Sequence, residues 1–340
     1  MPDDTRPTLA LAIGDPAGIS PELTARIMSD QEIQDAATLI VIGDRRVLED
    51  GARIAGVSLD LPVMSAGEPL PAPLPAVLLV DQGDLDIGLI ERGQASAAGG
   101  GSALSNFRAA LRLAASGRAG AVCFTPFNKQ AIKKSHPPYE DEVVFTAEFL
   151  GIEAATSEFN VLDEVWNARV TSHVPLSGVA PLITQERILR GLHATDRAMR
   201  EAGYLKPRIA VAALNPHAGE GGAFGREEID VIRPAVEAGR AEGIACDGPF
   251  PSDTVFVRAV HAKQFDAVLT MFHDQGQIAM KLIGFDRGIT LLGGFPFPIT
   301  TPAHGTAYDI AGQGKANPGA TKQALLLGAR MALARRAALV

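Results

Sequence analysis

Short apolar runs alternate with helical patterns along most of the chain. The runs are rich in Val, Ile, Leu and Ala, which is typical of strands buried on both faces of a sheet. Strands are expected at 9–13, 37–42, 76–80, 119–124, 168–171, 209–214, 267–271 and 289–292. The alternation predicts an α/β fold with a mostly parallel sheet and helices on both faces.

The segments between the strands predict helices. The first is ISPELTARIM, with Ser20 as the N-cap and Pro21 at the first helical position. Further helices are expected at 102–117, at 186–203, at 226–243 and from Lys322 onward. The proline-rich stretch 65–77 predicts an exposed loop, and AAGGGSAL at 97–104 predicts a flexible turn before a helix. No GxGxxG motif directly follows a strand, which argues against a Rossmann fold.

Length and charge limit the class of protein. A chain of 340 residues is long for one compact core, so two domains or one split domain are expected. The net charge is −8 and no basic stretch is dense, which makes nucleic acid an unfavourable partner. No segment has the pattern of a membrane span or a secretion signal, so a cytoplasmic protein is expected. Cys123 and Cys246 are expected to be free, buried thiols.

Polar side chains follow several of the predicted strands. Gly14-Asp15-Pro16 follows the first, and Thr125-Pro126 leads to Asn128 and Lys129 after another. Three of the seven histidines, His173, His217 and His273, also come just after apolar runs. Ligands of open α/β sheets bind beyond the carboxyl ends of the strands.

Three imidazoles at such strand ends can bind one divalent cation and leave positions open for substrate oxygens. Asp274 could join that site or orient a ring. The alternative for each histidine is a structural role in a hydrogen-bonded core.

Two glycine-rich loops are candidates for contacts with a nucleotide. NPHAGEGGAFGREE at 215–228 favours either a tight turn or a close approach of backbone amides to a nucleotide. HGTAYDIAGQGKANP at 304–318 resembles the adenine-binding loop of the isocitrate and isopropylmalate dehydrogenase superfamily. That resemblance implies NAD as the cofactor, since Asp309-Ile310 is the pair of NAD-using members. The implied cofactor-binding residues are His304, Gly305, Thr306, Ala307, Asp309, Ile310 and Asn317.

Over nearly its whole length the chain resembles the 4-hydroxythreonine-4-phosphate dehydrogenase (PdxA) family. The matching motifs are IGDPAGISPE, TSHVPL, LNPHAGEGGAFGREE, GPFPSDTVF, MFHDQGQIAMK and HGTAYDIAG. The resemblance implies an isopropylmalate-dehydrogenase-like fold, with two α/β domains around a central cleft. It also implies a homodimer with its active site at the interface, and metal ligands His173, His217 and His273. Residues 1–130 with 288–340 are expected to form the cofactor-side domain, and 131–287 the metal-binding and dimerisation domain.

The resemblance also assigns catalytic and substrate-binding residues. Lys281 matches a substrate-contacting lysine, Asp253 matches an acid of a family motif, and Asp274 is expected to tune the site. Glu142 lies about where the family carries a substrate-binding His-Thr pair. Thr290 and Ile299 lie where it has an asparagine and an arginine that contact substrate. Because isoleucine cannot replace a guanidinium and glutamate repels phosphate, the expected substrate is not phosphorylated.

The sequence therefore predicts an NAD-dependent dehydrogenase with a divalent metal (zinc, manganese or magnesium). It would oxidise a small hydroxy acid to a β-keto acid, with decarboxylation to follow. Three alternatives stay open: true 4-hydroxythreonine-4-phosphate dehydrogenase, a cis-dihydrodiol dicarboxylate dehydrogenase of the terephthalate type, and a non-catalytic metal- or nucleotide-binding protein.

Overall fold

The chain folds into two compact units. The computed structural model describes residues 6–153 and 157–338. Unit 1 comprises residues 1–156 and 289–340, and unit 2 comprises residues 157–288. The first unit is discontinuous along the chain, and its first boundary falls near residue 156, whereas the expected domain boundary was at 130. The reason is that α5 (Lys129–Ser135) and α6 (Glu142–Leu150) pack against α4 (Ala97–Ala115) of unit 1.

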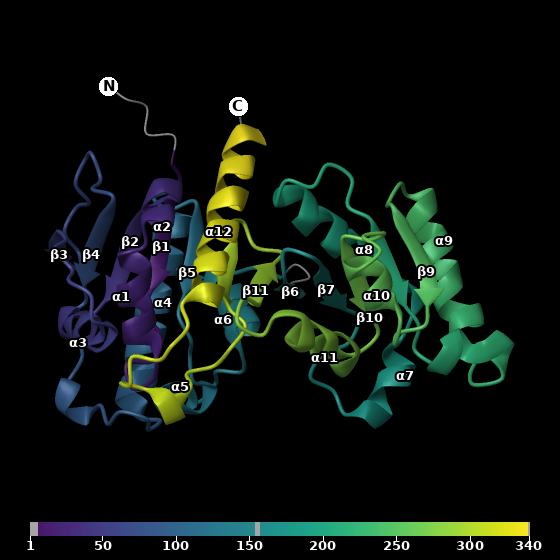
Figure 1. Ribbon diagram of the computed structural model, residues 1–340, viewed down its shortest axis with the longest axis horizontal. Helices are drawn as coiled ribbons and strands as arrows, with labels where there is room; N and C mark the ends of the chain where they lie inside the picture. Colours follow the sequence, from purple (N-terminus) through teal and green to yellow (C-terminus); the bar gives the residue numbers. More distant parts are fainter. Residues whose placement is uncertain (1–5, 154–156, 339–340) are drawn as a thin grey trace. The chain divides into compact units, whose positions relative to one another are not determined.

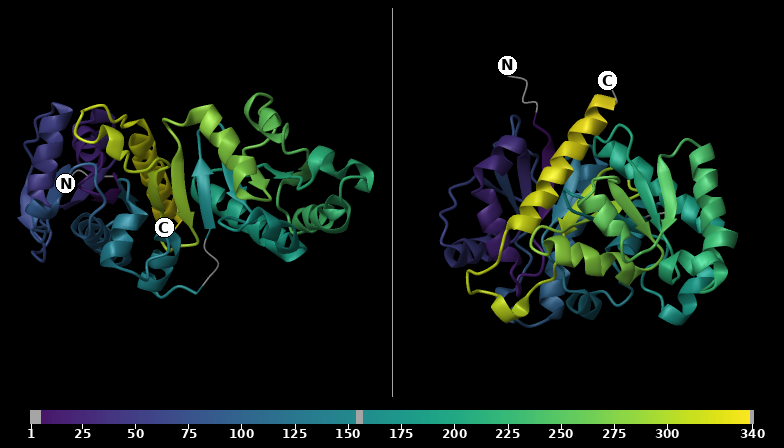
Figure 2. Two further views of the ribbon diagram at one scale, coloured as in Figure 1. Left: turned by 90° about the horizontal axis from the view of Figure 1, so that it is seen from below. Right: turned by 45° about the vertical axis from the view of Figure 1, so that its right-hand side comes forward.

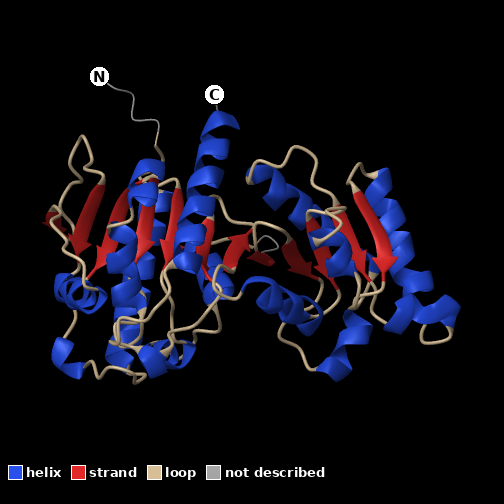
Figure 3. Cartoon of the chain, viewed as in Figure 1, coloured by secondary structure: helices blue, strands red, loops and turns tan. Residues whose placement is uncertain are grey.

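Unit 1 is built on strands in the order β3-β4-β2-β1-β5-β12-β11 (Figures 1 and 3). All neighbouring pairs are parallel except β11 with β12. The strands are β1 (Thr8–Ala12), β2 (Thr38–Gly43), β3 (Val63–Ser65), β4 (Val77–Asp81), β5 (Ala121–Phe124), β11 (Ile289–Gly293) and β12 (Ile299–Pro302).

Helices cover both faces of the unit 1 sheet. On one face α4 contributes Phe107 to a core shared with Ala10 and Ile40. On the other, α12 (Gly319–Ala338) packs on β12 and β5. The remaining helices are α1 (Ser20–Met28), α2 (Gln31–Ala36) and α3 (Arg45–Ala55), with short 3-10 turns at Ile87–Leu89 and Tyr308–Ile310.

Two local expectations for unit 1 were wrong. Ser20 is the first helical residue, not the N-cap, and its hydroxyl donates to the carbonyl of Pro126. The glycines at 99–101 are helical, not a flexible turn, because α4 begins at Ala97 with Ser96 as its cap. A Cβ on Gly100 would lie 2.2 Å from the Ala131 carbonyl, so this glycine permits close packing of α4 on α5.

Unit 2 is built on strands in the order β6-β7-β10-β8-β9. Only β6 with β7 is antiparallel among these neighbouring pairs. The strands are β6 (Ser157–Val161), β7 (Trp166–Arg169), β8 (Ile209–Ala212), β9 (Cys246–Phe250) and β10 (Ala267–Thr270). The sequence did not predict β3, β6, β9 or β12. β9 contains Pro249 and lies at an edge, where proline is tolerated.

Helices also flank the unit 2 strands, as the left-hand view of Figure 2 shows. On one face Gly191 of α8 (Gln185–Glu201) lies against Leu269 of β10. On the other, α10 (Val255–Val260) and α11 (His273–Gly284) enclose Val268. The other helical segments are α7 (Val179–Leu182), α9 (Arg233–Ala241), 3-10 turns at Leu176–Gly178 and Pro216–Gly222, and a π-helical turn at Glu228–Ile232.

The mixed α/β fold with mostly parallel strands is thus confirmed. Both cysteines are free and buried, as expected. No helix in the described part of the chain is long and apolar enough to cross a membrane.

Candidate active site

The three strand-end histidines belong to neighbouring parallel strands of unit 2. β10 lies between β7 and β8 and runs parallel to both. His173 follows β7, His217 follows β8, and His273 is the first residue of α11, three positions after the last residue of β10. The backbone beyond β7 stays beside β10, since the Thr171 amide donates to the Met271 carbonyl. All three histidines therefore come after the carboxyl ends of adjacent strands.

His173 and His273 lie side by side. Their ring centroids are 5.8 Å apart. The Nδ1 of His273 is 2.7 Å from the Asp274 carboxylate, which leaves Nε2 as the ring nitrogen that faces other partners. Two imidazoles arranged in this way are suitable donors for a zinc-like or manganese-like ion.

His217 lies on a turn with unusual backbone geometry. The φ angles from His217 to Gly222 are all positive, including those of the non-glycine residues Ala218 and Glu220. Such residues cost roughly 1–2 kcal/mol each, so the surroundings must hold the turn in place. The buried carboxylate of Glu228 accepts hydrogen bonds from the Leu214 and Asn215 amides just before the turn, at 2.8 and 2.7 Å.

These histidines do not form a complete metal centre within the described residues. There, no three His, Cys, Asp or Glu side chains come close enough together to hold an ion. The imidazole pair fits a metal ion by its chemistry, while the ring of His217 lies next to Phe224, at 6.2 Å between centroids.

The other expected catalytic residues of unit 2 are exposed. Lys281 lies on α11, seven residues after Asp274, which places both on one helix face two turns apart. Asp253 is exposed between β9 and α10.

In unit 1, the loop 304–318 lies against the end of β1 and the start of α1. Ile19, Leu23 and Ala316 form a small core with Ala307 and Ile310 beside it. Burial lowers the pKa of His304, so its imidazole is neutral near pH 7. A neutral ring can stack on a base.

Other loop residues can also serve a nucleotide. The Asp309 side chain is exposed and can accept from a hydroxyl group. The Asn317 side chain accepts from the Gly319 amide at the start of α12. The loop therefore has apolar packing below it and polar groups at its surface.

The acidic segment 140–142 lies at the start of α6. Asp141 caps this helix, and Glu142 occupies its first turn. The Glu142 carboxylate is 3.4 Å from the Nζ of Lys129, the first residue of α5. Sequence reasoning had noted Lys129 only as a polar residue after a strand.

Ile299 is not available to a substrate, contrary to expectation. It is fully buried in β12, within the core that contains Phe124 and Phe107. Thr290 is partly buried in β11, opposite Thr301 of β12. Of the residues expected to bind substrate in unit 1, Glu142 has the most direct contact with a charged neighbour.

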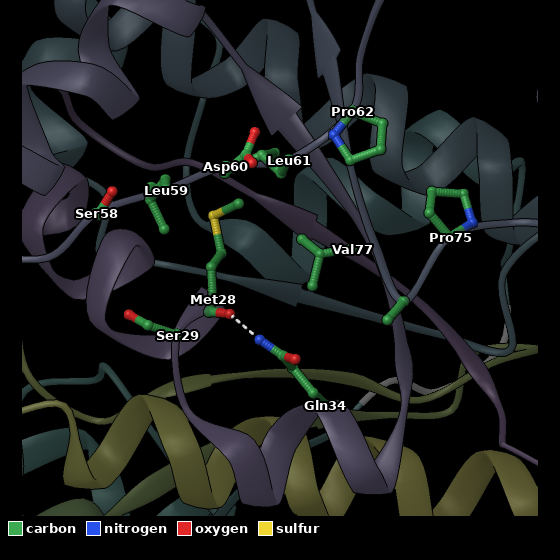
Figure 4. Close-up of a pocket in the computed structure, with 11 residues that line it drawn as sticks. Met28, Ser29, Gln34, Ser58, Leu59, Asp60, Leu61, Pro62, Pro75 and Val77 are labelled. Carbon is green, nitrogen blue, oxygen red and sulfur yellow. Dashed lines mark hydrogen bonds between the residues drawn. The ribbon is translucent and has the colours of Figure 1, made fainter.

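A pocket elsewhere in unit 1 contains none of the expected site residues. Figure 4 shows it between the end of α1 and the start of β4, where Met28 accepts a hydrogen bond from Gln34. Its volume is about 390 Å³. It lies where β4 begins, whereas the candidate residues follow strand ends, so it is not part of the candidate site.

Comparisons with known proteins identify the family. The family model described as "Pyridoxal phosphate biosynthetic protein PdxA" matches residues 35–328. A protein of Rhizobium meliloti named "Putative 4-hydroxythreonine-4-phosphate dehydrogenase 2" is 57% identical over 98% of this chain and 96% of its own length. A Symbiobacterium thermophilum protein named "Putative D-threonate 4-phosphate dehydrogenase" is 37% identical over 98% of this chain and 99% of its own length.

Solved structures agree with this relationship. The crystal structure of 4-hydroxythreonine-4-phosphate dehydrogenase from Klebsiella pneumoniae matches with a TM-score of 0.83 and 33% identity, covering 97% of this chain and 99% of that one. A terephthalate 1,2-cis-dihydrodioldehydrogenase from Burkholderia xenovorans matches with a TM-score of 0.62 and 29% identity, covering 97% and 98%. The chain belongs to the PdxA family and is a dehydrogenase that acts on a CH–OH group.

Proposed function

We propose that the protein is an NAD-dependent and divalent-metal-dependent dehydrogenase that oxidises a hydroxy acid without a phosphate group. The single observation that carries the choice of substrate is the Lys129–Glu142 ion pair. A cation that already faces a carboxylate is a poor partner for a phosphate, and the acids at 140–142 repel one. A neutral substrate end that carries a hydroxyl group is compatible with the same surroundings.

The proposed cofactors would supply Lewis acidity and a hydride acceptor, which protein side chains do not provide. A divalent ion held by His173, His217 and His273 would supply Lewis acidity toward the substrate hydroxyl and an adjacent carboxylate oxygen. NAD bound on the loop 304–318 would accept the hydride from the substrate C–H.

The residues of this chain would bind the substrate and orient the groups that take part in the reaction. Asp274 fixes the ring of His273 through its 2.7 Å contact with Nδ1. In this proposal Lys281 would bind a substrate carboxylate or accept the hydroxyl proton. The oxidised β-keto acid then loses carbon dioxide, and Lys281 can return a proton to the carbon that is left.

We propose that a second subunit completes the metal site. Apolar side chains with large exposed fractions surround the histidines in unit 2. They are Val174 and Leu176 after His173, Phe224 beside His217, and Ile278, Leu282 and Phe285 on the helix that His273 begins. Such a surface favours a covering partner, and a second copy would bring a further set of imidazoles to the His173–His273 pair.

A subunit-complementation experiment tests the shared site. His217→Ala and His273→Ala should each abolish metal binding and turnover. If the ligands come from two subunits, a mixed dimer of these two variants regains one intact site and part of the activity. If each subunit binds metal alone, the mixture stays inactive, and the shared site is refuted.

A substrate comparison tests the proposed reaction. NADH formation is measured with Zn²⁺, Mn²⁺ or Mg²⁺ on non-phosphorylated hydroxy acids and dihydrodiol acids, beside 4-phosphohydroxythreonine and D-threonate 4-phosphate. Selective turnover of a non-phosphorylated acid with release of carbon dioxide supports the proposal. Selective turnover of a phosphorylated acid refutes it. Turnover of 4-phosphohydroxythreonine would favour the activity named for the Rhizobium meliloti relative, and turnover of D-threonate 4-phosphate the activity named for the Symbiobacterium thermophilum relative.

A further inference from the structure

The loop 304–318 is attached to the N-terminal part of unit 1 by several hydrogen bonds. The Ile19 amide donates to the Thr306 carbonyl at 3.0 Å, and Arg26 donates to the Gly314 carbonyl at 2.8 Å. A third link joins two side chains, because the Tyr308 hydroxyl donates to the Asp15 carboxylate at 2.6 Å. The first link joins two backbone groups and the second depends on the side chain of Arg26 alone, whereas the third depends on the identity of both residues.

Asp15 is itself held rigidly. It is 1% exposed, at the turn that follows β1. Its Oδ1 accepts from the Ala17 amide at 2.9 Å, and its own amide donates to the Pro126 carbonyl at 3.0 Å. A Cβ on Gly99, in the first turn of α4, would lie 3.0 Å from that Oδ1, so no larger residue fits there without displacing a neighbour. The Asp15 carboxylate is therefore a rigidly held acceptor for a side chain that donates a hydrogen bond to it.

Tyr308 connects the loop 304–318 to the rigidly held Asp15 carboxylate. It is half-buried, and it lies directly before Asp309 and after Ala307, whose φ of 43° is left-handed. A left-handed alanine is an unfavourable conformation that its neighbours must maintain. With its hydroxyl bound to Asp15, Tyr308 holds this turn with the Asp309 side chain toward solvent.

We propose that Tyr308 is a positioning residue for the nicotinamide nucleotide, acting through its hydrogen bond to Asp15. This inference rests on the proposed NAD dependence. The bond keeps the loop 304–318 in its binding conformation before the nucleotide arrives, so binding does not have to order the loop. Tyr308 makes no contribution to hydride transfer itself.

The experiment measures the dissociation constant for NADH, kcat and the KM for NAD in Tyr308→Phe. Loss of a hydrogen bond to a carboxylate should weaken NADH binding and raise the KM by about tenfold. The value of kcat should change less than about twofold, because the reacting groups are untouched. Amide hydrogen exchange at Ile19, measured without nucleotide, should become faster as the loop loosens.

Two further variants separate positioning from general stability. In Asp15→Asn the side-chain oxygen can still accept from Ala17 and the amide can donate to the Tyr308 oxygen, so NADH affinity should stay near wild type. Tyr139→Phe, which removes a hydroxyl from a buried tyrosine elsewhere in unit 1, should leave NADH affinity unchanged. If the wild-type protein binds NADH and Tyr308→Phe binds it with the same affinity, the proposed role of Tyr308 is overturned, while the proposed NAD dependence is not. A wild-type protein that does not bind NADH overturns both this role and the proposed NAD dependence.

Discussion

Replacing Glu142 with glutamine changes the charge beside Lys129 without changing the shape of the side chain. The two groups are 3.4 Å apart, with 19% of the Glu142 side chain and 48% of the Lys129 side chain exposed. In Glu142→Gln the lysine loses its anionic partner, and the start of α6 loses one of its acids. An anionic substrate end should therefore bind better in the variant than in the wild-type protein.

The size of the effect follows from this geometry. A hydrogen bond to a charged group contributes about 1.5–3 kcal/mol, and the half-exposed Lys129 is screened by water, which reduces the gain to about 1–2 kcal/mol. Since each 1.4 kcal/mol is a factor of ten, the KM for a phosphorylated hydroxy acid should fall by about 5- to 30-fold. The KM for a non-phosphorylated acid should rise or stay constant.

The assay compares kcat and KM for D-threonate 4-phosphate and for the best non-phosphorylated substrate in both proteins. Glu148→Gln is the matched control, because it removes the same charge from an exposed position of the same helix. It should not alter either KM. If Glu142→Gln leaves both values unchanged, the ion pair does not lie near the substrate, and the argument for a non-phosphorylated substrate loses its basis.

Three further predictions concern packing and protonation. Ile299→Ala should lower the free energy of unfolding by about 2–5 kcal/mol in chemical denaturation while the KM for substrate stays constant; a large change in KM would return Ile299 to the binding site. Gly100→Ala should destabilise the protein by about 1–3 kcal/mol, because its Cβ would meet the Ala131 carbonyl at 2.2 Å; an unchanged melting temperature would contradict this packing. Burial lowers the pKa of His304 from 6.5, so the unfolded chain binds the proton first as the pH falls, and stability declines below about that pH. His304→Asn should lack this part of the decline in melting curves taken from pH 8 to pH 5, and an identical pH profile would refute it.

The sequence pattern was sufficient to predict the strands whose formation depends on burial of a continuous apolar run. Each strand of unit 1 or unit 2 with a continuous apolar run was predicted, within about two residues at most ends. The strands that were missed, such as β9 with Pro249 and β6 with Glu158, carry polar or proline residues because they pair at an edge or antiparallel to a neighbour. The glycines at 99–101 were misjudged because their role depends on α5, whose position the local sequence does not reveal.

For the candidate site, too, the sequence predicted what local pattern decides and missed what depends on distant residues. The sequence could place the three histidines at the ends of separate strands and at one edge of the sheet, because parallel strands direct their carboxyl ends to one edge. It did not predict that these strands are adjacent, in the order β7-β10-β8. The mutual distances of the histidines could not be predicted, since they depend on the left-handed turn at His217 and on Glu228, which holds it from the far side of the loop. Asp15 was visible only as a polar residue after β1, and its partner Tyr308 lies 293 positions away.

The two candidate regions within this chain differ in how complete they are. The loop 304–318 has its support within unit 1, from the core around Ile19 to the bond between Tyr308 and Asp15. The histidines of unit 2 lie on exposed surface among apolar side chains, and among the described residues they lack a third ligand. If the nucleotide site is preformed and the metal site needs a second subunit, NADH affinity and metal affinity should depend differently on protein concentration. On dilution, NADH affinity should persist while metal affinity and turnover fall together, because in the proposed arrangement only the metal site requires the second subunit.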